Sequence, residues 1–198
     1  MLPKGCAFDY VIACDHGYDH AKRMGIRPDV IIGDLDSLDQ GERMETVPVL
    51  RYPEQKDDSD TMLAVKYALQ EGFTHLILSC ALGGRLDHLF ANLQTMAYAA
   101  QRNCDAELYG EGEYIRTFTG GTLELPRREG YSLSLFSLSD ICTGLTIEGA
   151  SYNVSRADLT NTFPLGLSNG WKADRVLITM KQGILLVVES RLENGQNH

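Results

Sequence analysis

The 198-residue sequence has no apolar run close to the length of a membrane span and no paired-cysteine pattern. A transmembrane helix needs about 20 consecutive apolar residues, whereas the longest run here, ILLVV at 184–188, has the length of a buried strand. The first ten residues, MLPKGCAFDY, lack the apolar stretch of a signal peptide. The five cysteines are scattered and form no C-x-x-C pair, which argues against a disulfide framework or a zinc site. We therefore expect a cytoplasmic protein that does not bind a membrane.

The sequence also has fewer basic than acidic residues. The sequence has 18 lysines and arginines against 27 aspartates and glutamates, so its formal net charge is −9. Binding to a nucleic-acid backbone requires a basic surface, so this charge argues against a nucleic-acid partner. It is compatible with a nucleotide, because Mg²⁺ ions that accompany nucleotides prefer carboxylate ligands.

The first half of the chain alternates strand and helix patterns. Apolar runs predict strands near residues 10–13, 30–32, 47–52, 75–79 and 107–109. Helical spacing predicts helices near residues 18–24, 39–45, 58–71 and 86–101. This alternation predicts an α/β domain over residues 1–112 with a doubly wound, mostly parallel, Rossmann-like sheet.

The pattern changes after the GEG stretch at 110–112. Short strand patterns separated by turn residues follow at 114–118, 131–136, 145–148, 175–180 and 185–189. The alternation of apolar and polar residues in SLSL is typical of an antiparallel strand with one buried face. Residues 113–198 are therefore predicted to form a smaller all-β, sandwich-like domain.

Four polar clusters follow predicted strands in the first half. They read DHG at 15–17, GDLDS at 33–37, KDDSD at 56–60 and GGRLDH at 83–88. In doubly wound sheets, ligands bind outside the carboxyl ends of the strands. Four such clusters at one edge of a sheet suggest a functional site.

The two aspartates of GDLDS are the first candidates for metal ligands. Asp34 and Asp36 are two residues apart, so in extended backbone their side chains point the same way. Two close carboxylates repel, and a hard cation such as Mg²⁺ relieves that repulsion. The alternative is a solvated loop in which Asp34 or Ser37 caps the next helix.

The KDDSD stretch offers a third carboxylate. Ser59 or Asp58 has the right chemistry to cap the following helix, and Asp60 suits the positive end of the helix dipole. Asp60 is the simplest third ligand for the same cation, and Lys56 is a candidate for binding a phosphate.

The GGRLDH stretch opens the clearest helix pattern of the chain. Two glycines permit close approach of a ligand to the backbone, and Arg85 can bind phosphate oxygens with its forked guanidinium group. Asp87 can orient a hydroxyl, accept its proton or join the metal ligands. The alternative is a simple turn, with Asp87 in the first helical turn and His88 in solvent.

Taken together, these stretches resemble the thiamine pyrophosphokinase family. The resemblance rests on PDVIIGDLDSL, KDDSDTMLAVKYAL, LGGRLDHLFANL and LSNGW, in this order, and spans about residues 9–189. It implies an α/β nucleotide-binding domain followed by a β-sandwich-like domain. It also implies transfer of a diphosphate group from ATP to the hydroxyl of thiamine, which yields thiamine diphosphate and AMP. Magnesium and a homodimer with thiamine near the subunit interface are further implications.

The resemblance also implies roles for individual residues. Residues 1–112 would bind ATP and magnesium and carry the catalytic groups, and residues 113–198 would bind thiamine and dimerise. The expected metal ligands are Asp34, Asp36 and Asp60. The expected ATP and phosphate contacts are Asp15, Lys56 and Arg85, and the expected catalytic residues are Asp57, Arg85 and Asp87, with Asp57 or Asp87 as the base. Ser168, Asn169 and Trp171 are the expected thiamine contacts, although a lone tryptophan is more often a core residue.

The sequence departs from the family pattern at three places. The family has a further strand and a glycine-rich turn before the position of Tyr10, whereas nine residues precede Tyr10 here. Either the chain starts inside its natural sequence or this member is short, and in both cases part of the nucleotide site would be missing. His16 replaces a glycine of the family's Asp-Gly-Gly, and Ser59 replaces a threonine but keeps the hydroxyl.

Three other interpretations compete with a diphosphokinase. A magnesium-dependent phosphohydrolase would use Asp34 as its nucleophile, but GGRLDH and LSNGW have no role in such an enzyme. A protein of the same fold that binds thiamine or a nucleotide without turnover is compatible with His16 and the short N-terminus. A purely structural domain leaves the four acidic clusters without an explanation.

Overall fold

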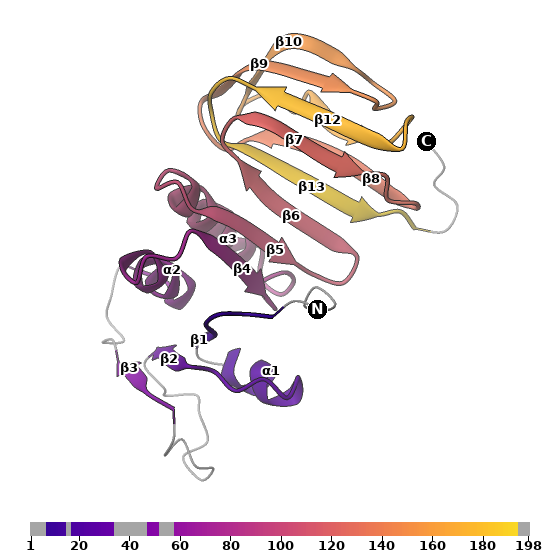
Figure 1. The fold of residues 1–198 in the computed structure, drawn as a ribbon. Helices are drawn as coiled ribbons and strands as arrows, with labels where there is room; N and C mark the ends of the chain where they lie inside the picture. The colour runs from indigo at the N-terminus through magenta and orange to yellow at the C-terminus, as the bar shows by residue number, and fades with distance from the viewer. Residues whose placement is uncertain (1–6, 15–16, 34–46, 52–57, 194–198) are drawn as a thin grey trace. The chain divides into compact units, whose positions relative to one another are not determined.

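The structure is a computed structural model, and it describes residues 7–14, 17–33, 47–51 and 58–193 (Figure 1). The chain divides into two compact units. The smaller unit consists of Leu2–Phe73 and Gly83–Thr95, and the larger unit consists mainly of Thr74–Leu82 and Met96–His198. No helix among the described residues is both long enough and apolar enough to span a membrane.

The smaller unit contains a parallel three-stranded sheet. Its strands are β1 (Ile12–Cys14), β2 (Val30–Gly33) and β3 (Val49–Arg51), in the order β1-β2-β3. Helix α1 (Gly17–Arg23) contacts β1, and helix α2 (Asp60–Gln70) contacts β1 and β2. The described strands of residues 1–73 therefore pair in parallel, as the alternation of strand and helix patterns predicts.

Strand β2 is buried on both faces of this sheet. On one face, Val30 and Ile32 pack with Leu63 and Ala64 of α2. On the other face, Ile31 packs with Ala13 and is contacted by Tyr18 of α1 and Val49 of β3. Successive side chains of a strand point to opposite faces, so an uninterrupted run of β-branched residues is what a strand between two covered faces requires.

The larger unit contains a six-stranded mixed sheet with the order β11-β8-β13-β6-β5-β4. Its strands are β4 (His75–Ser79), β5 (Asp105–Tyr109), β6 (Glu113–Phe118), β8 (Tyr131–Ser137), β11 (Gly166–Asn169) and β13 (Leu185–Arg191). Strands β4 and β5 are parallel and are connected by helix α3 (Leu86–Ala100), whereas the other pairs of this sheet are antiparallel. The mixture of parallel and antiparallel pairs makes this an α/β structure.

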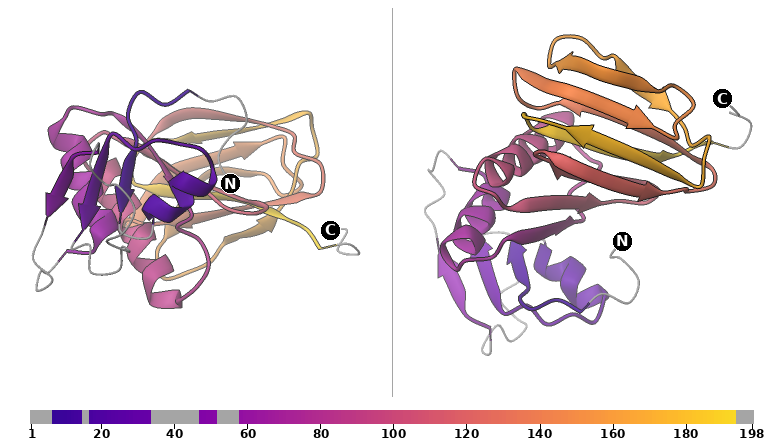
Figure 2. Two further views of the ribbon diagram at one scale, coloured as in Figure 1. Left: turned by 90° about the horizontal axis from the view of Figure 1, so that it is seen from below. Right: turned by 45° about the horizontal axis from the view of Figure 1, so that its top comes forward.

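A second, antiparallel sheet of four strands completes the larger unit. It has the order β10-β9-β12-β7 and consists of β7 (Gly121–Pro126), β9 (Ile141–Glu148), β10 (Val154–Thr160) and β12 (Arg175–Met180). One hydrophobic core joins the two sheets, because Leu133 and Val187 of the six-stranded sheet cluster with Ile147 and Ile178 of the four-stranded sheet. Figure 2 shows these two sheets from two further directions.

The predicted boundary near Gly112 lies inside a β-hairpin. Strands β5 and β6 pair antiparallel on either side of it, and the amide of Gly110 donates to the carbonyl oxygen of Glu113 at 2.9 Å. The six-stranded sheet therefore continues across residues 110–112, and β4 and β5 belong to the larger compact unit. The assignment of separate functions to residues 1–112 and 113–198 stays a prediction.

The shared core of the larger unit generates a stability prediction. Ile178 is fully buried in it, and we expect Ile178→Ala to lower the free energy of unfolding by about 2–5 kcal/mol, because it removes buried apolar atoms and leaves a cavity. Urea unfolding followed by the fluorescence of Trp171, the single tryptophan and a member of the same core, measures this change. The control is Thr179→Ala, the exposed neighbour, for which we expect a change within about 0.5 kcal/mol. Equal effects of the two substitutions would contradict the assigned core.

Candidate functional site

The structure describes six of the predicted site residues. Asp60, Arg85 and Asp87 belong to the smaller compact unit, whereas Ser168, Asn169 and Trp171 belong to the larger unit. The other predicted site residues lie outside the described residues, and their roles stay predictions. They are Asp15, Asp34, Asp36, Lys56 and Asp57.

The carboxyl ends of the three parallel strands lie at one edge of their sheet. Cys14, the last residue of β1, pairs with Ile32, and Gly33, the last residue of β2, pairs with Arg51, the last residue of β3. In the sequence, Asp15 follows Cys14 directly and Asp34 follows Gly33 directly. The ends of β1, β2 and β3 are therefore arranged as the hypothesis requires for three of the four clusters. The fourth cluster, GGRLDH, follows β4, which belongs to the six-stranded sheet, so the prediction of a single sheet edge for all four is corrected.

Helix α2 begins at this edge. The thiol of Cys14 donates to the backbone carbonyl oxygen of Asp60 at a Sγ–O distance of 3.7 Å, which joins the end of β1 to the first residue of the helix. Ser59 is the N-cap, because its hydroxyl oxygen accepts a hydrogen bond from the amide of Met62 at 3.2 Å. One of the two capping residues that the sequence allowed is thereby confirmed, and Asp60 lies in the first helical turn.

The acidic residues that flank Ser59 have different environments. The Nζ atom of Lys66 donates to both carboxylate oxygens of Asp58, at 2.8 and 2.7 Å. Asp58 therefore forms an ion pair with a lysine of the helix that follows it. Asp60 has its carboxylate in the first turn, where the positive end of the helix dipole favours an anion. The role of Asp60 as a metal ligand stays a prediction.

The Gly83-Gly84 turn leads into helix α3. Both glycines have positive φ angles, 92° and 73°, which residues with a side chain rarely adopt. Arg85 follows them, and its Nε and Nη2 atoms donate to the two oxygens of Asp87 at 3.1 and 2.5 Å. The amide of His88 also donates to Oδ1 of Asp87, at 2.9 Å. This turn therefore presents a guanidinium group at the start of a helix, where anions bind favourably.

The ion pair changes the acidity of Asp87. The hydrogen bonds from the Arg85 guanidinium lower the pKa of the Asp87 carboxyl group below its ordinary value, and the hydrogen bond from the His88 amide acts in the same direction. Asp87 in turn raises the pKa of Arg85. Asp87 is therefore an ionised partner of Arg85 and a weak proton acceptor while the pair is intact.

The residues expected to contact thiamine lie on β11 and just after it. The side-chain amide of Asn169 binds the backbone of Tyr152, since Oδ1 accepts from the Tyr152 amide at 3.0 Å and Nδ2 donates to the Tyr152 carbonyl oxygen at 2.8 Å. Ser168 has a positive φ angle of 56°, and its amide donates to the hydroxyl oxygen of Ser134 at 3.0 Å. Asn169 therefore holds the backbone of Tyr152, a residue that the sequence pattern did not single out, whereas Ser168 is joined to Ser134.

Trp171 is a core residue. Its side chain belongs to the hydrophobic core between the two sheets, and its indole Nε1 donates to the carbonyl oxygen of Leu125 at 3.3 Å. The sequence left open whether this ring packs in the core or stacks on the substrate, and its burial favours the core. A contact between Trp171 and thiamine stays a prediction, which this burial does not support.

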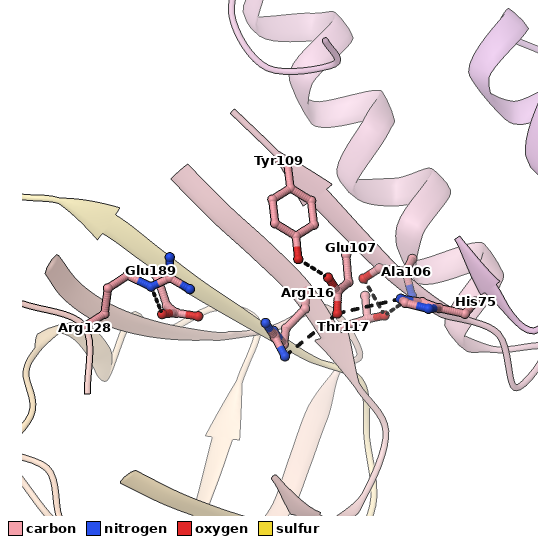
Figure 3. Close-up of polar contacts among 8 residues, drawn as sticks. All are labelled: His75, Ala106, Glu107, Tyr109, Arg116, Thr117, Arg128 and Glu189. Atoms are coloured by element: carbon pink, nitrogen blue, oxygen red, sulfur yellow. Dashed lines mark hydrogen bonds and ion pairs between the residues drawn. The ribbon is translucent and has the colours of Figure 1, made fainter. Parts of the chain in front are cut away.

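The larger unit also contains a network of charged residues across its six-stranded sheet (Figure 3). One oxygen of Glu107 lies 3.7 Å from Nε2 of His75 and 3.8 Å from Nη1 of Arg116, and the other accepts a hydrogen bond from the Tyr109 hydroxyl. Farther along the sheet, the buried carboxylate of Glu189 accepts from Nε of Arg128 at 2.8 Å. The contacts of Glu107 with His75 and Arg116 join neighbouring strands and that of Glu189 joins a strand and a loop, so these ion pairs support strand pairing, whereas the Tyr109 contact lies within β5.

Within the described ranges, no group of three or more His, Cys, Asp or Glu side chains is close enough to hold a metal ion. The geometry instead defines a mixed α/β protein with a parallel sheet edge, a carboxylate at one helix start and an arginine at another. Parallel sheet edges and helix starts are general locations of anion and ligand binding in proteins.

Comparison with known proteins identifies the family. The family model described as thiamin pyrophosphokinase, catalytic domain, matches residues 7–108, and the model described as thiamin pyrophosphokinase, vitamin B1 binding domain, matches residues 122–185. The chain therefore belongs to the thiamin pyrophosphokinase family, and the resemblance inferred from its motifs is confirmed.

Individual relatives agree with this assignment. The thiamine pyrophosphokinase of Bacillus subtilis is 27% identical over 184 residues, which cover 90% of this chain and 86% of the relative. A crystal structure of thiamine pyrophosphokinase from Bacillus subtilis superimposes with a TM-score of 0.84 at 25% identity and covers 93% of this chain and 90% of that chain. The thiamin pyrophosphokinase from Geobacillus thermodenitrificans has the same fold, with a TM-score of 0.81 at 23% identity and coverage of 96% and 91%.

The Arg85–Asp87 pair generates a testable pKa prediction. Because the guanidinium group stabilises the ionised carboxylate, Asp87 in the native protein stays ionised to lower pH than an ordinary aspartate, and Arg85→Gln should raise its pKa toward the ordinary value of about 3.9. NMR titration of the side-chain carboxyl carbons measures this change. Arg102→Gln, beyond the other end of α3, is the control and should leave the titration of Asp87 unchanged. An unchanged Asp87 pKa in Arg85→Gln would contradict the pair.

Proposed function

We propose that this protein transfers a diphosphate group from ATP to the hydroxyl of thiamine and releases thiamine diphosphate and AMP. The observation that carries the proposal is the pair of family matches, catalytic at residues 7–108 and vitamin B1-binding at residues 122–185, in this order along one chain. The protein is thus an ATP-dependent thiamine diphosphokinase, a transferase of thiamine diphosphate biosynthesis. The phosphohydrolase and the non-catalytic interpretations are not favoured by these matches.

The proposal includes a division of labour along the chain. A Rossmann-like α/β domain binds ATP at the carboxyl edge of its parallel strands, and a sandwich-like β domain binds thiamine. The parallel pairing of β1, β2 and β3 and the shared core of the two antiparallel-rich sheets support these two descriptions. Ligand binding at the carboxyl edge follows the general rule for open parallel sheets.

In the proposed reaction, the hydroxyl oxygen of thiamine forms a bond to the β-phosphorus of ATP. The bond between the β-phosphorus and the oxygen that bridges it to the α-phosphorus breaks, and AMP leaves with that oxygen. Transfer of this kind depends mainly on positioning and on neutralisation of negative charge. Arg85 and Lys56 supply positive charge, and Arg85 stands at a helix start that adds backbone N–H groups.

The hydroxyl proton passes to a carboxylate, for which the sequence offers Asp57 and Asp87. Both oxygens of Asp87 accept hydrogen bonds from Arg85, and these bonds lower its pKa. A carboxylate in this state is a poor proton acceptor. We therefore assign the general base to Asp57 and assign to Asp87 the orientation of Arg85.

Magnesium is part of the proposal. Asp34, Asp36 and Asp60 would hold it, and oxygen-only ligands are the donor set that Mg²⁺ prefers. The first-turn position of Asp60, beside the end of β1, fits such a ligand set. When bound, the ion would neutralise part of the negative charge of the phosphate groups.

A homodimer with thiamine near the subunit interface is the family expectation that we adopt. Exposed apolar side chains occur in the vitamin B1-binding match, at Phe163, Leu165 and Leu167. Apolar side chains gathered on a surface are typical of protein–protein contacts. ATP and thiamine are the proposed small-molecule partners, and a cytoplasmic location stays a prediction.

A product assay tests the reaction. Incubation of the purified protein with thiamine, ATP and Mg²⁺ should form AMP and thiamine diphosphate in equal amounts, because attack at the β-phosphorus makes AMP the leaving group. Separation of the nucleotides and thiamine esters by chromatography measures both products. Release of inorganic phosphate would support the phosphohydrolase, ADP would indicate an ordinary kinase, and binding without products would support the non-catalytic protein.

A substitution tests the metal assignment. Asp34→Asn keeps the size of the side chain and removes its charge, and we expect it to lower kcat by about 10²–10³-fold, because charge stabilisation of the transferring group is lost. Glu129→Gln, a matched change at an exposed ion pair of the larger unit, should leave kcat unchanged. Circular dichroism of both variants checks the fold. An Asp34→Asn enzyme with full activity would rule out Asp34 as a metal ligand.

A further inference from the structure

Residues 149–152 follow strand β9 and are held by backbone hydrogen bonds from residues 170–173. The carbonyl oxygen of Gly149 accepts from the amides of Lys172 and Ala173, both at 2.9 Å, and the amide of Ser151 donates to the carbonyl oxygen of Gly170 at 2.9 Å. Ala150 forms an isolated β-bridge with the buried Trp171. The 149–152 segment is therefore fixed to the core of the larger unit.

Asn169 completes this arrangement at Tyr152. Its side-chain oxygen Oδ1 accepts from the amides of Tyr152 and Gly170, the latter at 2.9 Å. Its NH₂ group donates to the backbone carbonyl oxygen of Tyr152. Both the donor and the acceptor of the Asn169 side chain are thus used on backbone groups. This asparagine determines the position of the Tyr152 backbone.

The side chain of Tyr152 is nevertheless exposed. Its relative exposure is 72%, although an aromatic side chain normally buries most of its surface. Ser168, next to Asn169, has a φ angle of 56°, a conformation that costs free energy for a residue with a side chain. An exposed ring on a backbone that Asn169 holds at both its amide and its carbonyl group is the arrangement expected of a pre-organised contact.

We propose that Tyr152 is a specificity-determining residue that stacks on the cationic heteroaromatic ring of thiamine, and that Asn169 is the positioning residue that holds Tyr152 for this contact. The proposal rests on the proposed function, and Tyr152 lies inside the vitamin B1-binding match at residues 122–185. The face of a tyrosine ring is negative and attracts a cation such as the thiazolium ring. Trp171, the alternative ring, is buried in the core.

Steady-state kinetics with thiamine and ATP test the contact. Tyr152→Ala and Tyr152→Leu should raise KM for thiamine about tenfold, because the cation–π contact is lost in both. Tyr152→Phe keeps the ring and should change KM by less than about threefold, and KM for ATP should stay constant in all three variants. Ser151→Ala, in the same segment, keeps the backbone hydrogen bonds and serves as the control without effect.

A double-mutant cycle tests the role of Asn169. Asn169→Ala should raise KM for thiamine and leave kcat nearly unchanged, because it loosens Tyr152 and not the reacting groups. In the Tyr152→Ala background, the same substitution should have little further effect, since residues that act through one contact are not additive. Equal effects of Asn169→Ala in the two backgrounds would show that Asn169 does not act through Tyr152.

Two further measurements separate this proposal from its alternatives. Calorimetric binding of thiamine to the wild-type protein and to Tyr152→Ala should show a dissociation constant about tenfold higher in the variant, whether or not the wild type forms AMP. An inactive wild type with this difference would overturn the proposed function and support the contact. An active wild type with unchanged KM in Tyr152→Ala, or a dimer that dissociates only in that variant, would overturn the contact and assign the ring to a subunit interface.

Discussion

Parallel pairing of β1, β2 and β3 brings the carboxyl ends of these strands to one edge, and the arrangement of the candidate site depends on it. The pairing requires that both faces of β2 are covered, and its three β-branched residues meet α2 on one face and Ala13 and Tyr18 on the other. The Cys14–Asp60 hydrogen bond then joins the start of α2 to the same edge. The proposed site for a charged ligand therefore follows the ends of apolar strands.

In the larger unit, the proposed thiamine contact lies on the segment between β9 and β10 and at the end of β11. Two sheets share one core, and residues 149–152 and 169–171 are attached to that core through backbone bonds and through Trp171. Asn169 satisfies the polar groups of Tyr152 and so holds an exposed ring on a rigid backbone. A side chain held in place in this way loses less conformational entropy when it contacts a ligand.

Much of the fold could be predicted from apolar periodicity. The runs that became β2, β8 and β13 matched buried strands, and these elements are confirmed. Helix α3 is confirmed as an element, but Leu86 and Phe90 of its apolar spacing are exposed. Strands β7, β10 and β11 were not predicted, and all three are edge strands of their sheets. Edge strands are often short or polar because one side of them meets solvent, so their apolar periodicity is weak. The predicted boundary near Gly112 falls inside the β5–β6 hairpin and also between the two family matches, so the division of functions at this position stays a prediction.

The sequence by itself determined the family, the class of chemistry and the stretches that carry it, because four motifs in a set order are specific even when each alone is weak. It also determined Ser59 as one of two candidate caps. Only the tertiary structure decided between alternatives that have the same local pattern. Asp87 binds Arg85, which is two residues away. Trp171 lies in the core and Asn169 binds Tyr152, because the partners of these two side chains come from other segments of the chain. Local sequence cannot specify such contacts, since packing chooses among them.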